Sequence, residues 1–350
     1  MSEPPIDHNF ILLTLIRSPL EWAWIKILGK AYEDETQLEM EQMFSDRECL
    51  EEMCFPTLHR IVLGLNNAPL ENYIRQNPDC IDTTDSYGRT VLSWAAQRGA
   101  VDTVKLLLRF GANPNLCTGR GHSPLMYAAE ARDPGCLRPL LERGADVTQC
   151  DTEGQTSLHY AAGHRSDLAY YRPLIEANAD PNWLTIPRMT PLTTVILEGH
   201  DDATRYLVEN GADINLKGHD ERSPAFYAVE YNNPFALRYL FEMGANFTRA
   251  SLSYPSIAHV AAHHANAESL QTLASFRLIL KDVDCVDSEG LTIPQIVEKR
   301  LQTEPVLGEN FTQAFNTFLE SIRMEEVVES SVVEPEDDDE FHDAHEEISI

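Results

Sequence analysis

Short apolar stretches recur along most of this chain at helical spacing, and polar turns of similar composition separate them. In the stretch Val104 to Leu108, apolar side chains fall on one face of a helix. Gly111 follows, at a position where a helix can end in a left-handed residue. A second kind of stretch carries a small pair, as at Ala161 and Ala162, after a threonine that can cap a helix. The pattern predicts an all-α protein built from pairs of short helices.

The helical pairs repeat at a nearly constant distance. A threonine or serine precedes the small pair at five places, spaced 33, 33, 34 and 33 residues apart: Thr90, Ser123, Thr156, Thr190 and Ser223. A second marker, Gly-Ala, keeps the same register at Gly111, Gly144, Gly211 and Gly244, and Asn178-Ala179 fills the remaining slot. Two markers in one register indicate a tandem repeat, in which each helix pair buries its apolar face against its neighbours.

The repeat unit resembles the ankyrin repeat, whose motif combines D-x-x-G-x-T-P-L-H-x-A-A with a second helix and G-A-D-x-N. Residues 151–162 read DTEGQTSLHYAA, and residues 104–115 read VKLLLRFGANPN. The resemblance implies an α-solenoid of stacked helix pairs, with hairpin tips between the pairs and helical caps at both ends. The long leader and the proline-interrupted repeats are also similar to those of fungal proteins with many ankyrin repeats, a likeness that names no pathway.

The expected organisation has four parts. We expect a helical, acidic leader over 1–54, an ankyrin array over 55–302, a capping helix over 303–324 and an acidic tail over 325–350. Within the array we expect an opening repeat over 55–84, full repeats over about 85–117, 118–150, 151–184, 185–217 and 218–250, a degenerate repeat over 251–286 and a closing half repeat over 287–302. The tail is expected to be disordered, because it combines few apolar residues with 12 acids between Glu325 and Glu347.

Four residues depart from the repeat pattern. Arg188 and Glu221 stand where the hairpin glycine usually lies, so we expect altered tips in the fourth and fifth full repeats. Pro139 and Pro173 lie in the region of second helices, where a proline removes a backbone donor. We therefore expect these two helices to be shortened or shifted.

The charge of the chain narrows the choice of partners. The chain carries 27 Lys and Arg against 56 Asp and Glu, a formal net charge of −29. A surface of that sign repels phosphate backbones and anionic lipids, which argues against nucleic-acid and membrane partners. We expect a protein partner that is basic or of mixed charge, and we expect this chain to be a monomer.

The cysteines and the start of the chain bear on its location. The 7 cysteines form no C-x-x-C pair and no even framework, which is typical of reduced intracellular thiols. The apolar run Phe10 to Ile16 lacks the positive flank of a signal peptide and is too short for a membrane helix. We therefore expect a cytoplasmic or nuclear protein. The apolar stretch Leu20 to Leu28 is expected to pack on the array or on a partner helix.

One pattern could indicate catalysis: His259-Val260-Ala261-Ala262-His263 superficially resembles the zinc motif H-E-x-x-H. Val260 stands where that motif needs its general-base glutamate, and spacing places no third ligand. His259 also falls on the ankyrin histidine position. No phosphate loop or nucleophile motif is present. We therefore expect no catalytic residue, no metal, no cofactor and no enzymatic activity, while a cryptic hydrolase or metal site that includes His263 stays as an alternative.

Aromatic residues recur at one position of the repeat, directly before the small or apolar pair. They are Trp94, Tyr127, Tyr160 and Tyr227, and Thr194 and Val260 occupy the same position in two other repeats. An aromatic stripe can line a ligand groove. Because this position packs between helices in the family, we expect these rings to lie in the core instead.

The resemblance also indicates which residues remain for binding. In ankyrin proteins the hairpin tips and the inner-helix residues after the small pair line the concave face. Carried over to this chain, the tips contribute Tyr87, Arg89, Arg120, His122, Glu153 and Arg222, and the helix positions contribute Arg98, Glu130, His164, Tyr231 and His263. Further tip residues are Ile186 and Met189. Tyr and Arg are enriched in interface hot spots, which favours Tyr87, Arg98, Arg120, Arg222 and Tyr231.

The predicted function is that of a non-catalytic scaffold or adaptor, which binds a partner protein through the concave face. A second interpretation is a regulatory subunit whose acidic tail masks a basic partner, such as a transcription or chromatin factor. That interpretation predicts binding that weakens with salt. The cryptic enzyme is the third interpretation.

Overall fold

The computed structural model describes residues 55–218, 221–246, 256–276, 286–287, 289–304 and 307–330, with side chains as far as residue 322. The chain divides into two compact units, Met1–Pro224 and Ala225–Ile350. Within the described residues all regular elements are helices, and two isolated β-bridges join Thr84 to Thr90 and Cys150 to Thr156. The predicted all-α class is confirmed. The expectations for the leader over 1–54 and for the tail beyond residue 330 lie outside the described residues.

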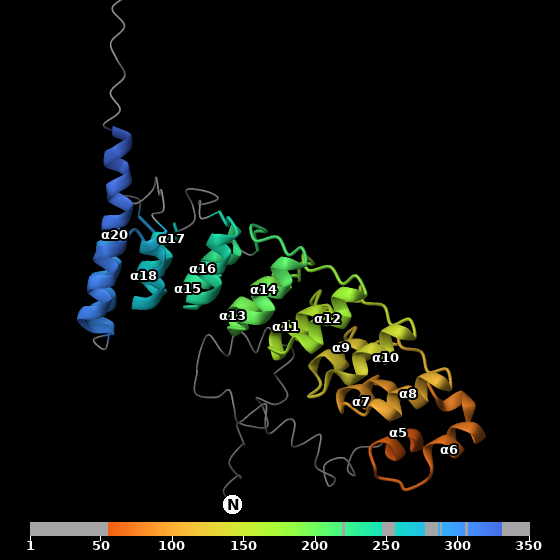
Figure 1. Ribbon diagram of the computed structural model, residues 1–350. Coiled ribbons are helices and arrows are strands. Elements are labelled where there is room, and N and C mark those ends of the chain that lie inside the picture. Colours follow the sequence, from red (N-terminus) through yellow and green to blue (C-terminus); the bar gives the residue numbers. More distant parts are fainter. Residues whose placement is uncertain are drawn as a thin grey trace, which may run out of the picture. The chain divides into compact units, whose positions relative to one another are not determined.

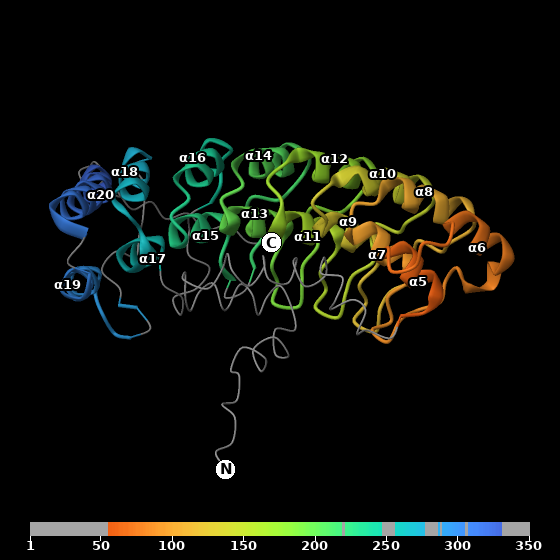
Figure 2. The same cartoon turned by 90° about the horizontal axis from the view of Figure 1, so that it is seen from below.

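The first unit consists of helix pairs arranged in two rows (Figures 1 and 2). The inner row is α5 (Thr57–Val62), α7 (Val91–Gln97), α9 (Pro124–Glu130), α11 (Ser157–His164) and α13 (Pro191–Glu198). The outer row is α6 (Leu70–Gln76), α8 (Val101–Arg109), α10 (Leu137–Glu142), α12 (Leu168–Glu176) and α14 (Asp201–Glu209), with short 3-10 helices at Pro78–Cys80 and Pro134–Cys136. Within each row every helix from α7 or α8 onward contacts its neighbour, which is the stacking expected of a solenoid.

The second unit continues the alternation of shorter helices and ends in a long one. Its helices are α15 (Pro224–Glu230), which begins at the boundary, α16 (Pro234–Glu242), α17 (Ile257–His264), α18 (Ala267–Ser275), α19 (Ile293–Thr303) and α20 (Gly308–Ser330). Helix α18 packs on α16 and α20, and α17 packs on α19. One face of α20 buries Phe311, Phe315, Phe318 and Ile322. Among the described helices, none combines the length and hydropathy needed to cross a bilayer.

Side-chain hydroxyls begin the inner helices. The Thr90 hydroxyl accepts the backbone N–H of Ser93 at 3.2 Å, and the Thr190 hydroxyl accepts that of Thr193 at 3.1 Å. The small pairs that follow, such as Ala161 with Ala162, are fully buried between neighbouring helices. The sequence pattern of a hydroxyl followed by a small pair thus sets both the start of each inner helix and its close approach to the next.

The outer helices end in left-handed residues, as the Gly-Ala markers predict. Gly111, Gly144 and Gly211 have φ values of 91°, 83° and 94°. Asn178 takes the same place with φ 64°, and the next residue, Ala179, donates its N–H to Leu174 O at 2.9 Å. Asparagine is the residue that most often replaces glycine in this conformation, so the irregular repeat keeps the common helix end.

Asparagine side chains join successive repeats beyond these helix ends. The Asn115 amide donates to Gly144 O at 2.9 Å and accepts the N–H of Asp146 at 2.8 Å. Asn182 makes the same two bonds two helix pairs further on, to Gly211 O at 2.9 Å and from Asp213 N at 2.7 Å. One amide thus satisfies both a carbonyl and an N–H of the next loop, and the loops of the first unit are fastened to one another.

The two prolines affect their helices differently. Helix α10 has six residues and follows a 3-10 turn, so Pro139 lies in its first turn, where no backbone donor is needed. The prediction of a shortened helix is confirmed there. Helix α12 keeps nine residues, as α8 and α14 do, although Pro173 lies inside it. For α12 the prediction was wrong, because the buried side chains of Tyr170 and Tyr171, shortly before Pro173, hold the helix in place.

Candidate functional site

Two hairpin tips of the first unit are built around an aspartate. In the tip Asp151 to Gln155, Oδ1 of Asp151 accepts the backbone N–H groups of Glu153 at 2.9 Å and of Gln155 at 2.8 Å. Gly154 supplies the left-handed conformation, with φ 78°. One carboxylate oxygen thereby orders the whole turn.

Two other aspartates make the same pair of bonds. Asp85 Oδ1 accepts from Tyr87 N at 2.8 Å and from Arg89 N at 2.9 Å. In the second unit, Asp287 Oδ1 accepts from the N–H groups of Glu289 and Leu291 at 2.8 and 2.9 Å. These three carboxylates are less than a tenth exposed, so their geometry belongs to the fold and not to the solvent-facing surface.

The second oxygen of each tip aspartate binds a ring on an inner helix. Trp94 Nε1 donates to Asp85 Oδ2 at 2.8 Å, and the Tyr160 hydroxyl donates to Asp151 Oδ2 at 2.8 Å. In the second unit the ring of His263 holds Nε2 2.9 Å from Asp287 Oδ2. A charged acceptor strengthens each of these bonds, so the aspartates clamp the tips to the inner helices.

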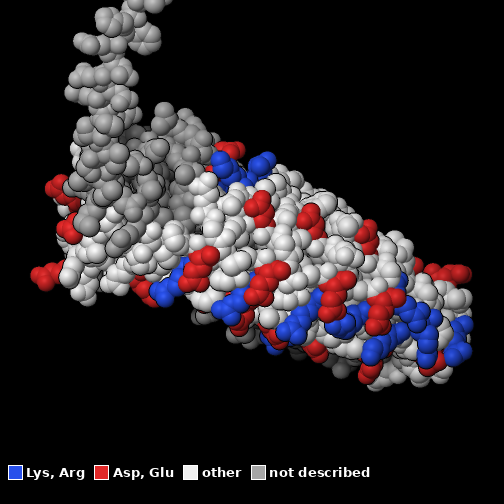
Figure 3. Space-filling model, turned by 45° about the horizontal axis from the view of Figure 1, so that its top comes forward, with Lys and Arg blue, Asp and Glu red and all other residues white. Residues whose placement is uncertain are grey.

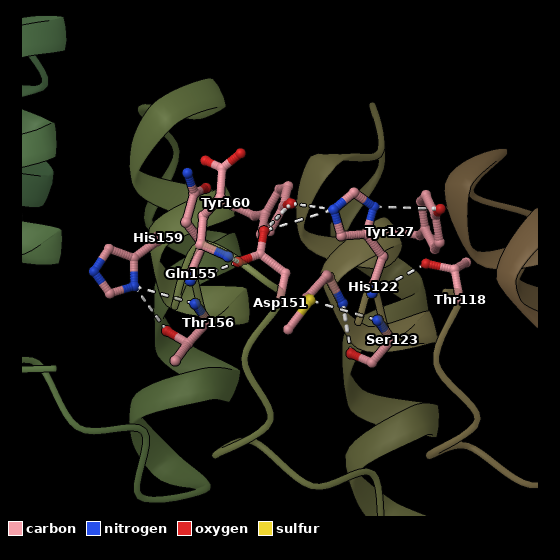
Figure 4. A network of polar contacts seen from close by, with 11 residues as sticks. Thr118, His122, Ser123, Tyr127, Asp151, Gln155, Thr156, His159 and Tyr160 are labelled. Atoms are coloured by element: carbon pink, nitrogen blue, oxygen red, sulfur yellow. Dashed lines mark hydrogen bonds and ion pairs between the residues drawn. The ribbon is translucent and has the colours of Figure 1, made fainter. Parts of the chain in front are cut away.

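Around Asp151 the clamp extends into a network between two repeats (Figure 4). Nε2 of His122 lies 2.9 Å from the Tyr160 hydroxyl and 3.6 Å from Asp151 Oδ2. On the other side of its ring, Nδ1 of His122 lies 3.5 Å from the Tyr127 hydroxyl. The network ties the tip of one repeat to the inner helices of its own and the following repeat.

Two groups of this network, Asp151 and Tyr160, have shifted pKa values. Burial by itself raises the pKa of Asp151, but the hydrogen bonds from His122, from the Gln155 backbone and from Tyr160 together hold that pKa below its usual value. Burial, and then the charge of Asp151, raise the pKa of Tyr160. At neutral pH an ionised acceptor thus faces a neutral donor, an arrangement that strengthens the hydrogen bond between Asp151 and Tyr160.

The aromatic stripe is part of the core, as the repeat position predicts. Trp94 is 1% exposed, and Tyr127 and Tyr160 are each 4% exposed. Their polar atoms point to the clamps and their rings lie between helices. The stripe therefore does not line a groove.

Three of the predicted binding residues lie on the surface of the first unit. Tyr87 is 62% exposed at its tip, and Arg98 and Arg120 are also exposed. The tip residue Ile186 has the highest exposure of the large apolar side chains described, at 71%. The hairpin tips therefore carry the most solvent-exposed apolar groups of this unit.

Arg89 and His122, in contrast, are engaged inside the molecule. The Arg89 guanidinium lies over the Trp94 ring at 4.8 Å and over the Tyr127 ring at 5.0 Å, and it donates to Gln97 Oε1 at 3.1 Å. His122 belongs to the Asp151 network. Both side chains are half-buried and fasten tips to helices.

Glu130, Glu153 and His164 are half-buried as well. The His164 ring stacks on Tyr160 with centroids 6.4 Å apart, and its Nδ1 lies 3.0 Å from the Tyr160 carbonyl. The Glu130 carbonyl accepts a hydrogen bond from Arg165. Glu130 and His164 end the inner helices α9 and α11, whereas Glu153 lies in the tip that begins at Asp151.

The remaining predicted residues divide between the units. Arg222 is half-buried in the first unit, whereas Tyr231, 39% exposed, and His263, bound to Asp287, belong to the second. The predicted residues that belong to the first unit are therefore Tyr87, Arg89, Arg98, Arg120, His122, Glu130, Glu153, His164 and Arg222.

The sequence analysis missed the clamp aspartates. A signal was present, because Asp85 precedes Trp94 and Asp151 precedes Tyr160 by nine residues in both repeats. An acidic residue and a ring donor at one fixed spacing in a tandem repeat indicate a repeated hydrogen bond. In the repeat between these two, the residue nine positions before Tyr127 is Thr118, which has no carboxylate.

The histidines of α17 take separate partners. His259 is fully buried, with Nδ1 2.7 Å from the Ser256 hydroxyl, and His263 faces Asp287. Across the described ranges, no three His, Cys, Asp or Glu side chains are grouped to hold a metal ion. Burial raises the pKa of the Cys136 thiol to about 11, which leaves it in its unreactive form at neutral pH.

Comparison with protein families identifies the repeat. The family model described as ankyrin repeats (3 copies) matches residues 58–151, 92–182 and 158–251. Two curated proteins, both called ankyrin repeat domain-containing protein 63, from Homo sapiens and Mus musculus, are each 43% identical over 49 residues. That match covers 14% of this chain and 13% of the relatives, so it spans only a small part of their length.

Solved structures agree with the family comparison. The ankyrin repeat domain of human ASB11 has a TM-score of 0.53 at 24% identity, covering 61% of this chain and 97% of that domain. The ankyrin repeat domain of Bcl-3, a member of the IκB protein family, has a TM-score of 0.54 at 25% identity, covering 60% of this chain and 95% of that domain. At 24% identity, the similarity to the ASB11 domain shows a common fold and nothing about function.

Proposed function

This chain belongs to the ankyrin-repeat family, and we propose on that premise that it is a non-catalytic scaffold or adaptor that binds a partner protein through its hairpin tips and inner helices. Ankyrin repeat domains are typically protein–protein interaction modules. A fold alone does not fix a function. The observation that carries the proposal is the exposure of Tyr87 and Ile186, at 62% and 71%, on ordered tips of the first unit.

The backbone of these tips supports binding, because neighbouring tips hold each other. Thr152 N donates to Arg120 O at 2.9 Å, and Ile186 N donates to Glu153 O at 2.8 Å. A tip that is already ordered loses little conformational entropy when a partner binds. Side chains presented on it can therefore act as interface anchors.

The partner that we propose is a protein of mixed or basic charge, bound by a monomer of this chain in the cytoplasm or nucleus. On the face shown in Figure 3, Lys and Arg alternate with Asp and Glu instead of forming a uniform basic stripe. Arg138 of α10, for example, pairs with Glu176 of α12 at 3.0 Å. A nucleic acid requires a continuous basic surface, so the alternation favours protein.

The proposed absence of catalysis is supported by the state of the polar groups near the tips. Asp151 and Tyr160 are committed to each other, and burial lowers the pKa of His159 to about 4. A general base needs a pKa near the working pH and access to a substrate. These groups have neither.

Affinity capture with the full chain tests the proposal. The tip variant combines Tyr87→Ser with Ile186→Ser, and the control is Met243→Ser, which changes an apolar side chain that is 50% exposed at the end of an outer helix. Partners identified by mass spectrometry are then purified and titrated calorimetrically. We expect the tip variant to bind at least about tenfold more weakly, a loss of about 1.4 kcal/mol, while the control binds normally. A partner bound equally by all three proteins would contradict the proposal.

A further inference from the structure

The second unit contains an apolar groove that the tip surface does not include. The groove lies between α19 and α20 and has a volume of about 360 Å³. Val297 and Leu301 of α19 and Phe315 and Leu319 of α20 form its apolar walls, and Glu298 stands at its edge. Val297, Leu301 and Leu319 are only half-buried. No further helix follows α20 in the part of the chain that the structure describes.

Fixed contacts hold the two walls of this groove. The Arg300 guanidinium donates to Ala265 O at 2.9 Å and to Ala262 O at 3.3 Å, which anchors α19 on α17. The same guanidinium lies 5.0 Å from the centre of the Phe311 ring of α20. Phe318 of α20 is fully buried. The groove is therefore a stable feature of this unit.

The surroundings of the groove are acidic. Glu298 lines it, and the exposed Glu320 of α20 directly follows the wall residue Leu319. The nearby bases are engaged, because Lys299 pairs with Glu289 at 2.9 Å and Arg300 points inward. After Arg323 the chain carries 12 acids and no Lys or Arg. The helix that forms one wall thus leads directly into the most acidic segment of the sequence.

We propose that this groove docks an amphipathic helix of a partner protein whose polar face is basic. A helix presents apolar side chains at i, i+3, i+4 and i+7, which suits a short apolar groove between two helices. Lys and Arg on the rest of that helix would meet Glu298 and Glu320. Burial supplies affinity and charge supplies orientation and association rate. This site is separate from the tip surface and stands whether or not the tips bind a partner.

Charge decides against an acidic occupant. A helix rich in Asp and Glu would bring like charges against Glu298 and Glu320, which is unfavourable at short range. The same repulsion disfavours the apolar residues of the acidic tail itself. The basic amphipathic helix is the occupant that both the apolar walls and the charges accept.

Three labelled 18-residue peptides test this proposal by fluorescence anisotropy with the full chain. The first carries leucines at helical spacing and lysines elsewhere, the second has the same composition in scrambled order, and the third replaces the lysines by glutamates. We expect the first to bind at least about tenfold more tightly than either of the others, and we expect its binding to weaken as salt is raised. Equal binding of the scrambled peptide would overturn the proposal, because charge alone would then explain it.

Variants locate the binding in the groove. Val297→Ser with Leu319→Ser removes apolar wall, and Ile175→Ser, on half-buried Ile175 of α12, is the matched control. Circular dichroism and thermal melting must first show that all three proteins are equally folded and equally stable. We expect the groove variant to bind the basic peptide at least about tenfold more weakly than the unchanged protein, and the control to bind it with unchanged affinity. Unchanged binding to the groove variant would overturn the proposal, as would binding lost equally in both variants.

Discussion

Two neighbouring tips of the first unit form the same turn from different residues. In the tip at Asp151, a carboxylate accepts two backbone N–H groups and Gly154 takes φ 78°. In the next tip, only one side-chain bond holds the turn, from Met189 N to the Thr185 hydroxyl at 2.9 Å, and Arg188 takes φ 60°. A tip without aspartate and glycine thus forms the same turn, although fewer side-chain hydrogen bonds within the tip stabilise it.

The difference shows that the stack imposes the turn. Altered tips were expected at Arg188 and Glu221, but both residues are left-handed, with φ 60° and 57°, so the expected change of backbone was wrong. A left-handed L-residue costs about 1–2 kcal/mol. Contacts across repeats offset this strain at Arg188, including Ile186 N to Glu153 O at 2.8 Å and the Arg188 side chain to Lys217 O at 3.3 Å.

The largest effect that separates the two tips is expected from removing their turn acceptors. Asp151→Ala removes the acceptor of two backbone donors and leaves the buried Tyr160 hydroxyl with the His122 ring as its side-chain partner, so we expect a loss of about 3–4 kcal/mol in the free energy of unfolding. Thr185→Ala removes a single acceptor and costs about 1 kcal/mol. Urea unfolding followed by circular dichroism measures both losses.

The exposed Asp202 of α14 provides the control for these variants. Asp202→Ala should change stability by less than about 0.5 kcal/mol, as surface substitutions do. Equal losses for Asp151→Ala and Thr185→Ala would show that the carboxylate contributes nothing beyond a single turn bond.

A second prediction concerns His159, which connects the two tips. Its Nδ1 lies 3.3 Å from Thr156 N and its Nε2 lies 3.2 Å from Met189 O, so the neutral ring accepts at one nitrogen and donates at the other. Burial lowers its pKa from 6.5 to about 4. The unfolded chain therefore takes up a proton first as pH falls. The stability that neutral His159 contributes is complete above pH 6.5 and is lost progressively towards pH 4.

Urea unfolding at pH 7 and pH 5 measures this dependence. The linkage corresponds to a loss of about 2 kcal/mol between the two values. His159→Gln should lower stability at pH 7 and reduce the pH dependence by that amount. If the stability of the variant depends on pH as strongly as that of the unchanged protein, titratable groups other than His159 cause the dependence.

The smallest effect is expected from exchanging the turn residues. Arg188→Gly relieves the left-handed strain and should stabilise the protein by up to about 1 kcal/mol, part of the gain being offset by the greater freedom of glycine when unfolded. In the other tip, a Cβ on Gly154 would lie 3.2 Å from Ile186 N and from Thr185 Cα. Gly154→Ala should therefore destabilise the protein by about 1–2 kcal/mol. Calorimetric melting compares the two, and a destabilising Arg188→Gly would show that the arginine side chain outweighs its strain.

Much of the fold can be predicted from the sequence, because the same local requirements for helix starts, close packing and helix ends recur from repeat to repeat. The hydroxyl at Thr90, the small pair Ala161 with Ala162 and the helix end at Asn178 each have a physical requirement that a single position reveals. The path of α12 through Pro173 could not be predicted in this way, because burial of the neighbouring rings decides it.

The candidate site was less accessible to sequence analysis for a related reason. The repeat register predicts the backbone position of each residue. It does not predict the direction in which a long side chain extends from that position. Arg89 begins at a tip but lies over the Trp94 and Tyr127 rings, whereas Tyr87, two positions earlier, points to solvent. Direction depends on which neighbouring ring or carboxylate is within reach, and a neighbour one repeat away is invisible to local patterns.

The contacts between neighbouring tips have a consequence for how such a protein can diversify. Since main-chain atoms supply the bonds from Thr152 to Arg120 and from Ile186 to Glu153, almost any residue can occupy those places without changing the turn. The recognition properties of the row can therefore drift by single substitutions while the architecture stays intact. A library randomised at residues 86–87, 119–120, 152–153 and 186–187 would vary specificity over a constant framework.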